Sequence, residues 1–461
     1  MEIVGVLILQ SKVRHGFTVR GVPLYMFYPY METYSPMLCS YKGTERKNLC
    51  ALAVIEHKDS TIPRGGIRRI LGEAGIWDIE RQALLWQYAP LRWKDQLACI
   101  EPSRSDRYRI TAPTINIDPE GCRDIDDVWS LWSEEDGIWH IAITIADVAS
   151  YVALNPWLQK AEQIGQTLYD NGRAVAPLFP PHLSEDLFSL RQGKERFGVS
   201  LFAVWDGTAL RDFVWKKTLV TTTASYSYEN CVEADMSVLS AVARYILPEA
   251  GEDPHKWIEA LMILYNTEAA KVLLQAGSGL LRTHSQPEAE ALERFTRLGL
   301  PAKELAYPAA QYTAIEPDRT EYLHWGLARS AYSHASSPIR RFADVLNQIR
   351  ILAVIEGKAV ADKDLSAQAM SLAALEKNAK RYERDRVFVD AFFGNETHTV
   401  EGVFVETTET HSTWYLPIWK KFVRAKPFQE DPGTRVTLAY FAFLGERSWK
   451  KRMVFELQAQ V

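Results

Sequence analysis

The sequence is poor in cysteine, with five in 461 residues, and no two of them form a CxxC pair. An odd number without paired spacing argues against a disulfide framework and against a structural zinc site. Unpaired cysteines are typical of a reducing compartment, so we expect a cytoplasmic protein.

Long apolar runs are also absent. No stretch approaches 18 consecutive apolar residues, so we expect no membrane span. The first residues, MEIVGVLILQ, are apolar, but Glu2 precedes the apolar run and no cleavage site follows. This pattern predicts a β-strand and not a signal peptide.

An excess of basic residues is missing too. The net charge is −5 and the isoelectric point is near 6.1, which argues against nucleic-acid binding over the whole surface. A basic channel inside an acidic surface stays compatible with these values. Basic residues do cluster locally, at Arg64, Arg68 and Arg69, at Arg191, Lys194 and Arg196, at Arg340 and Arg341, and at Lys450, Lys451 and Arg452.

One short stretch is rich in aspartate. Residues 114–128 read TINIDPEGCRDIDDV and contain Asp118, Asp124, Asp126 and Asp127. Two carboxylates about 4 Å apart repel by roughly 4 kcal/mol at an effective dielectric of 20, so a fold that gathers four needs a cation or must protonate some of them. Oxygen ligands select magnesium or manganese over zinc, and such a site suits phosphoryl chemistry.

Two other interpretations of this stretch are a solvated turn and a calcium-binding loop. A solvated turn is the commoner fate of an aspartate-rich loop. A calcium-binding EF-hand loop fails, because with Asp118 in position 1 the later ligand positions are filled by Glu120, Cys122 and Trp129.

The flanking sequence favours a rigid site over a simple turn. Residues 128–132 and 138–146 have the apolar patterns of strands and are separated by a turn at 134–137, which predicts a hairpin. Asp124 and Asp126 are two residues apart at its entrance, so in an extended chain they face the same side.

The aspartate-rich stretch resembles the catalytic domain of the ribonuclease II / ribonuclease R family. The family pattern is Ile-Asp, five residues, then Asp-x-Asp-Asp, and residues 117–118 and 124–127 fit it at the same spacing. Further segments similar to family blocks occur in family order and extend the resemblance over 63–392: 63–85, 177–200, 280–287 (LLRTHSQP), 332–346 (YSHASSPIRRFADVL) and 381–385 (RYERD).

The resemblance implies a processive exoribonuclease that hydrolyses single-stranded RNA from its 3′ end and releases nucleoside 5′-monophosphates. The implied cofactor is magnesium, with manganese as the alternative. Asp118, Asp124 and Asp127 match residues that hold the metal, and Asp126 matches a residue that is especially critical for cleavage. Arg340 matches an arginine that contacts the phosphate undergoing cleavage.

The matched blocks also imply residues that hold the RNA. An aromatic plane stacks on any base, which gives grip without sequence preference. The histidines of the matched blocks, His284 and His334, are expected to be structural, because they add no metal-ligand spacing. The residues assigned to RNA binding are Tyr169, Tyr228, Glu383 and Arg341.

A helix start is predicted at Ser337 and Pro338, with serine as the N-cap and proline as the first helical residue of a helix over 338–356. Arg340 then lies in the first turn, where free N–H groups and a guanidinium form an anion site. The alternative is an arginine in a structural salt bridge. Helices are also predicted over 287–298 and 365–392.

The expected fold class is α+β, with a mixed sheet surrounded by helices as the catalytic domain and small OB-type barrels on both sides. The expected domains are an N-terminal barrel (1–62), a second small module or linker (63–111), the catalytic domain (112–396) and a C-terminal RNA-binding barrel (397–461). In the last of these, aromatic and basic residues interleave, as in a stacking platform or a barrel core: Trp414, Tyr415, Trp419, Lys420 and Lys421.

The leading hypothesis is therefore a metal-dependent exoribonuclease that acts on single-stranded RNA as a monomer and does not bind membranes. An RNA-binding regulator with the same fold and little turnover is the alternative. A metal phosphohydrolase acting on a small nucleotide is a third hypothesis, and the aromatic and basic terminal barrels argue against it.

Overall fold

The structure is a computed structural model that forms two compact units. One unit comprises Met1–Pro90, Pro287–Ala306 and Asn378–Val461, and the other comprises Leu91–Gln286 and Tyr307–Lys377. None of the five cysteines, all of which lie among the described residues, forms a disulfide. No helix among the described residues is both long enough and apolar enough to cross a membrane. The structure describes residues 2–13, 15–31, 33–57, 62–93, 98–135, 137–231, 235–360, 364–394, 398–442 and 453–457.

The first unit contains a closed barrel with the strand order β1-β2-β3-β5-β4. Its interior is filled by apolar side chains such as Leu7, Phe27 and Met37, which are fully buried. The boundary expected at residue 62 falls inside this barrel, because its last strand follows that residue. Helix α1 (Trp77–Tyr88) comes next in the chain. The barrel strands are β1 (Ile3–Leu7), β2 (Leu24–Pro29), β3 (Met37–Ser40), β4 (Leu49–His57) and β5 (Arg64–Glu73).

The C-terminal part of the first unit is an antiparallel sheet with the order β19-β18-β17-β20-β21. Trp414 and Tyr415 are buried in it, so for these two residues the prediction of an exposed stacking platform is wrong. Lys420 is exposed, and the cluster predicted at 450–452 lies outside the described residues. The elements are α6 (Ala289–Arg297), α7 (Ala302–Ala306), β17 (Thr399–Thr407), β18 (Ser412–Leu416), β19 (Lys421–Ala425), β20 (Arg435–Ala442) and β21 (Met453–Leu457).

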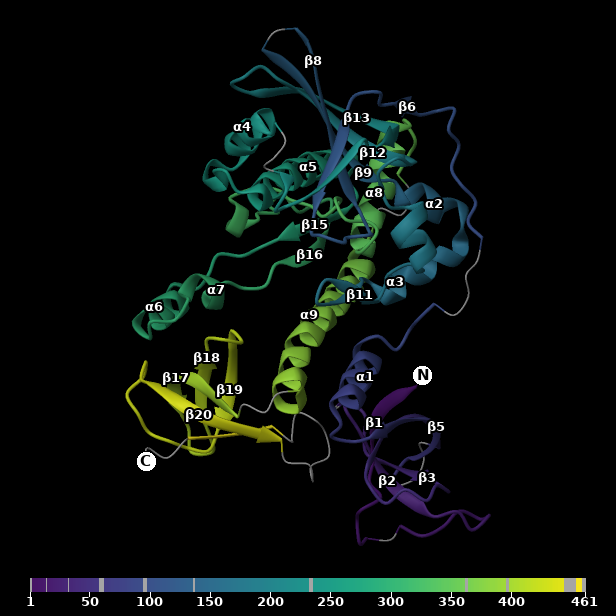
Figure 1. The fold of residues 1–461 in the computed structure, drawn as a ribbon, viewed down its shortest axis with the longest axis vertical. Coiled ribbons are helices and arrows are strands. Elements are labelled where there is room, and N and C mark those ends of the chain that lie inside the picture. Colours follow the sequence, from purple (N-terminus) through teal and green to yellow (C-terminus); the bar gives the residue numbers. More distant parts are fainter. Residues whose placement is uncertain are drawn as a thin grey trace. The chain divides into compact units, whose positions relative to one another are not determined.

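The second unit is built on a seven-stranded mixed sheet with the order β14-β7-β8-β9-β12-β13-β6 (Figure 1). The pairs β7/β14 and β6/β13 are parallel, and the other neighbours are antiparallel. The hairpin predicted after the aspartates is confirmed as β8 and β9. The strands are β6 (Tyr108–Arg109), β7 (Thr114–Asp118), β8 (Asp127–Glu135), β9 (Ile138–Ala146), β12 (Glu195–Trp205), β13 (Leu210–Thr221) and β14 (Ala224–Ser227).

The two faces of this sheet differ in chemistry because side chains alternate along each strand. One face packs against helix α5 (Pro254–Ala276), where the ring centroids of Trp215 and Tyr265 are 4.8 Å apart. On the other face, buried hydroxyls form a ladder across the strands. Ser200 Oγ lies 2.6 Å from Thr144 Oγ1 and 2.7 Å from Thr218 Oγ1, so these polar groups are satisfied by one another.

The chain contains further elements, two of which the sequence predicted. Helix α9 confirms the helix predicted over 365–392, and it spans both units. Helix α6 confirms the one predicted over 287–298, and Gly299, with φ +65°, follows its end. The remaining main elements are α2 (Val148–Leu154), α3 (Ala161–Ile164), β10 (Leu168–Asp170), β11 (Arg173–Ala176), α4 (Ser237–Ile246), β15 (Leu280–Thr283), β16 (Gln311–Ala314), α8 (Phe342–Ile355) and α9 (Ser366–Gly394).

The helix predicted to start at Ser337 begins instead at Phe342, so the prediction that Arg340 lies in its first turn is wrong. Residues 338–340 form a turn. The backbone after this turn pairs with a distant segment: Thr167 N–H donates to Arg340 C=O at 2.9 Å, and Phe342 N–H donates to Gly165 C=O at 2.8 Å. These long-range hydrogen bonds hold the chain in a β-bridge where local capping signals favour a helix.

Candidate active site

A cavity of about 780 Å³ in the second unit contains the aspartate-rich stretch. Of the nine residues predicted for the site, all but Glu383 line it. Glu383 lies exposed on α9, in the part of that helix that belongs to the first unit. The predicted residues that the fold brings together are Asp118, Asp124, Asp126, Asp127, Tyr169, Tyr228, Arg340 and Arg341.

The four aspartates are positioned by the ends of two neighbouring strands. Asp118 is the last residue of β7, and Asp127 is the first residue of β8. Asp124 and Asp126 lie in the connection between these strands. The Asp126 carbonyl is fixed as well, because it accepts a hydrogen bond of 2.9 Å from the Ala146 N–H at the end of β9. The spacing in the sequence is therefore the length of one strand-to-strand connection.

Asp126 and Arg340 form the central contact of the cavity. Asp126 is buried, with 5% of its side chain exposed, and its Oδ1 accepts a hydrogen bond of 2.8 Å from the Ile339 N–H. Its Oδ2 lies 3.4 Å from Arg340 Nε. The Arg340 side chain is 46% exposed, so its guanidinium is held at one edge and open at the other. An arginine in this state can pair with an incoming anion.

Burial and mutual repulsion raise the pKa of three carboxylates of the cavity, those of Asp118, Asp126 and Asp127. Burial, and then the charge of Asp118, raise the pKa of Asp127 to about 8. Burial is also the main cause that raises the pKa of Asp118, and it raises the pKa of Asp126 well above its ordinary value, although Arg340 opposes this. A bound cation would favour the ionised carboxylates and relieve the repulsion.

Neutral side chains orient two of the aspartates. Asn116 Nδ2 donates to Asp118 Oδ2 at 2.8 Å, and Ser225 Oγ donates to Asn116 Oδ1 at 2.6 Å. The Tyr169 hydroxyl donates to Asp124 Oδ2. One oxygen of each carboxylate is thus held by the protein. The tyrosine expected to stack on a base therefore has a bond to the acidic cluster, and Asn116 is a site residue that the sequence did not reveal.

Buried amides fix the segment that carries Arg340. Asn266 on α5 accepts from the Ala335 N–H at 2.8 Å and donates to Ser336 Oγ at 3.0 Å. Asn347 donates to the His334 carbonyl at 2.8 Å. A polar residue among buried apolar neighbours of a helix is the signal that could have found Asn266 and Asn347.

Two predicted basic contacts serve the fold. Arg341 forms a bidentate pair with the fully buried Asp344, with both N···O distances 2.8 Å, although it also lines the cavity. Arg196 donates to Asp186 Oδ1 at 2.8 Å and to the Ser189 carbonyl at 3.2 Å. His334 is structural, as predicted: it is hydrogen-bonded to Tyr312 at 3.0 Å, and burial lowers its pKa well below the ordinary value.

The donor set of the cavity fits a hard divalent cation, because it offers carboxylate oxygens whose charges need compensation. Among the described residues, no three side chains of ligand type are already gathered around one point. Magnesium commonly binds through one or two carboxylates together with water and substrate phosphates. Asp118, Asp124 and Asp127 are the residues that would hold it.

The chain is similar in sequence to a known protein family and to several known proteins. The family model for the RNB domain matches residues 107–238 and 239–357. The chain is 25% identical over 443 residues to the probable exosome complex exonuclease RRP44 of Caenorhabditis elegans, an alignment that covers 74% of this chain and 46% of that protein. The chain spans about half the length of the curated relatives it matches.

Solved structures share the fold at low identity. Mycoplasma genitalium RNase R in complex with ribose-methylated single-stranded RNA has a TM-score of 0.79 and 15% identity, and the match covers 99% of this chain and 90% of that one. The yeast pseudonuclease Ssd1 has a TM-score of 0.73 and 16% identity, and the match covers 95% of this chain and 67% of that one.

Proposed function

The chain belongs to the RNB domain family, and from this membership we propose that it is a 3′-to-5′ exoribonuclease of single-stranded RNA. It hydrolyses one nucleotide at a time, processively, and releases nucleoside 5′-monophosphates with magnesium as cofactor. The observation that carries the proposal is the arrangement of all four motif aspartates around one cavity, with Arg340 against Asp126.

The side chains of the cavity have separate tasks in this reaction. Bound magnesium supplies Lewis-acid stabilisation of the phosphate and a more acidic water. Arg340 pairs with the scissile phosphate through the open edge of its guanidinium and offsets the charge that develops there. Asp126 holds Arg340 through the 3.4 Å contact with Nε. The ring of Tyr228, beside the aspartates, stacks on a base near the strand end.

The Tyr169 hydroxyl and the Asn116 amide donate to Asp124 and Asp118. They therefore orient both carboxylates, and the Asn116 amide also favours the ionised form of Asp118. Water attacks the scissile phosphorus and the P–O3′ bond to the preceding nucleotide breaks. The 3′ oxygen leaves with a proton as the new strand end, so the phosphate stays on the 5′ oxygen of the released nucleotide.

The alternative is an RNA-binding regulator with little turnover. The fold similarity to the pseudonuclease Ssd1 favours it. The complete set of motif aspartates with Arg340 beside them favours the enzyme.

One assay separates the two functions. An oligoadenylate labelled at its 5′ end is incubated with the protein, with magnesium or with a chelator. The proposal predicts progressive shortening with magnesium, 5′-monophosphates from the start, and strong resistance of a strand whose 3′ end is in a duplex. Binding without shortening would establish the regulator. A broad ladder of internal cuts, or products with 3′-phosphates, would contradict an exonuclease.

A further inference from the structure

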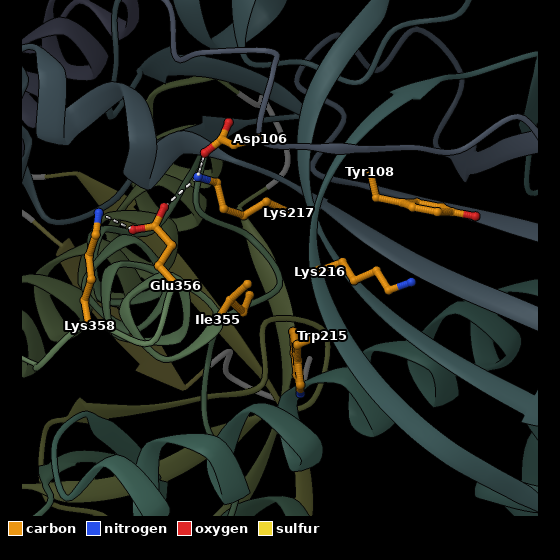
Figure 2. A pocket seen from close by; sticks show the side chains of 8 residues that line it. All are labelled: Asp106, Tyr108, Trp215, Lys216, Lys217, Ile355, Glu356 and Lys358. Carbon is orange, nitrogen blue, oxygen red and sulfur yellow. Dashed lines mark hydrogen bonds and ion pairs between the residues drawn. The ribbon is translucent and has the colours of Figure 1, made fainter.

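A second cavity lies at the edge of the seven-stranded sheet, outside the acidic site. Its volume is about 580 Å³, within the usual range for a small-molecule site. Strand β13 forms one wall, the segment before β6 forms another, and the C-terminal end of α8 completes it (Figure 2). It shares no lining residue with the acidic cavity. The residues that matter are Asp106, Tyr108, Lys216, Lys217, Glu356 and Lys358.

The cavity exists because the outer edge of β13 is only partly covered. Strand β6 pairs with Thr218 and Leu219 of β13. No strand of the described chain pairs with the outer edge of the preceding residues of β13. Lys216 and Lys217 are consecutive on this edge, so their side chains leave it in opposite directions, as Figure 2 shows.

The two lysines differ in charge compensation. Lys217 Nζ lies 2.5 Å from both Asp106 Oδ2 and Glu356 Oε1, and its side chain is only 10% exposed, so it is a structural cation. Lys358 Nζ lies 2.6 Å from Glu356 Oε2. Within the described part of the chain, no carboxylate lies within ion-pair distance of Lys216. Glu356 is therefore shared by Lys217 and Lys358, Asp106 pairs with Lys217, and Lys216 has no ion pair with any described residue.

Lys216 lies against two aromatic rings, of which Tyr108 is exposed and Phe202 is half-buried. Its ammonium is 4.4 Å from the centroid of the Tyr108 ring and 5.0 Å from that of Phe202. The Tyr108 ring meets Phe202 edge-on at 5.5 Å, and 49% of Tyr108 is exposed. Phe202 in turn contacts Trp132 on β8, with the ring centroids 6.3 Å apart. The contact with Phe202 braces the Tyr108 ring while leaving about half of the residue open to solvent.

We propose that this cavity binds a nucleotide, with the base stacked on Tyr108 and the phosphate paired with Lys216. An aromatic plane beside an unpaired cation is the combination by which proteins hold single-stranded nucleic acid without reading its sequence. The nucleotide is a unit of an RNA strand or a free nucleoside monophosphate. The site is separate from the acidic cavity, so the proposal goes beyond hydrolysis and does not depend on it.

An extended peptide is the other ligand that an open strand edge can take. Two features of β13 argue against it. Asp212 has φ +56°, and the pairing of β12 with β13 shifts register between Phe202 and Val204. A bulged edge with two consecutive lysines is a common protection against the addition of a strand.

The test measures binding by the whole 461-residue chain in a chelator, and the length of the RNA strand is checked afterwards. The probes are a long oligoadenylate, a trinucleotide, AMP and inorganic phosphate. The variants are Tyr108→Ala, Tyr108→Phe and Lys216→Gln. The matched controls are Tyr245→Ala, which removes a tyrosine of equal exposure on α4, and Lys256→Gln, which removes an exposed lysine of α5.

Tyr108→Ala is expected to weaken binding of the responsive probe by about 5- to 100-fold, while Tyr108→Phe keeps the ring and the affinity. For a strand, Lys216→Gln is expected to make the slope of log affinity against log salt shallower by about 0.7. A strand carrying 4-thiouridine should crosslink to the peptide that contains Tyr108.

The probes distinguish the sources of the nucleotide. If Tyr108→Ala and Lys216→Gln weaken binding of the long strand alone, the ligand is a segment of RNA. If they weaken binding of AMP equally, the ligand is the free nucleotide. Unchanged binding of every probe by Tyr108→Ala and Lys216→Gln, with no crosslink, would overturn the proposal and leave the edge to a protein partner. The rate of trinucleotide hydrolysis with magnesium should be the same in these variants as in the parent. This rate tests the proposed exoribonuclease activity separately from the proposed nucleotide site.

Discussion

Replacing Asp126 with asparagine tests the chemistry of the acidic cavity most directly. The substitution keeps the shape of the side chain. It also keeps an oxygen that can accept the hydrogen bond from the Ile339 N–H, which is 2.8 Å long in the parent. It removes the charge that lies 3.4 Å from Arg340 Nε. The change is therefore almost purely electrostatic, and its effects on rate and on folding can be separated.

The lost attraction follows from the distance. At 3.4 Å, Coulomb's law gives about 1 kcal/mol in water and about 5 kcal/mol at an effective dielectric of 20. Since 46% of the Arg340 side chain is exposed, the lower part of this range applies. Arg340 is then held by one contact fewer, because only its Nη2 donation to Ser337 Oγ at 3.0 Å is left among the contacts described, and its guanidinium is less fixed where it meets the phosphate. Removing one preorganised electrostatic group of this kind lowers kcat by about 10²- to 10³-fold.

The same change should not weaken the fold. Burial raises the pKa of Asp126 well above its ordinary value although Arg340 opposes this, so the desolvation cost of the charged form offsets what its attraction to Arg340 contributes to the fold. An amide avoids the desolvation cost of a buried carboxylate. We therefore expect Asp126→Asn to keep the parent's Tm at neutral pH in a chelator, or to exceed it, and to bind RNA as the parent does.

The assay is the release of mononucleotides from oligoadenylate, with Tm and RNA affinity measured on the same preparations. Asp318→Asn is the matched control, because it changes an exposed carboxylate in the turn after β16 and should leave all three quantities unchanged. A near-parental rate for Asp126→Asn would refute the role of the cluster. A lost rate accompanied by a fall in Tm would refute the electrostatic explanation.

Three further outcomes are expected. Asn116→Ala removes the 2.8 Å donor to Asp118 and should lower kcat about 10- to 100-fold with unchanged RNA affinity, and an unchanged kcat would show that Asp118 needs no orientation. Burial lowers the pKa of His324 from 6.5 to about 4, so the stability that its neutral ring contributes is fully present above pH 6.5 and is lost as the pH falls towards 4. The free energy of unfolding should fall by at most about 3 kcal/mol over this range because of His324, and His324→Asn should remove this part of the pH dependence in acid denaturation. RNA affinity should fall steeply with salt despite the net charge of −5, because phosphate contacts release counterions, and a flat plot of log affinity against log salt would contradict a basic channel.

The sequence by itself determined the features that depend on local order. The two apolar runs after the aspartates, separated by a turn, predicted the hairpin of β8 and β9, because apolar runs of strand length on both sides of a turn form paired strands. The spacing from Asp118 to Asp127 placed both residues at one end of neighbouring strands, because a short connection cannot carry the chain away. The long helix α9 followed from its uninterrupted helix-forming residues.

Only the tertiary structure decided which distant residues meet. Arg340 contacts Asp126 across more than 200 positions of the chain, and no periodicity encodes that pairing. The helix start moved to Phe342 because hydrogen bonds to 165–167 outweighed a good local cap. Trp414 is buried in the C-terminal sheet, although the same alternation of aromatic and basic residues fits an exposed platform. Local propensities amount to about 1 kcal/mol, whereas burial and long-range hydrogen bonds amount to several, so the latter decided wherever the two disagreed.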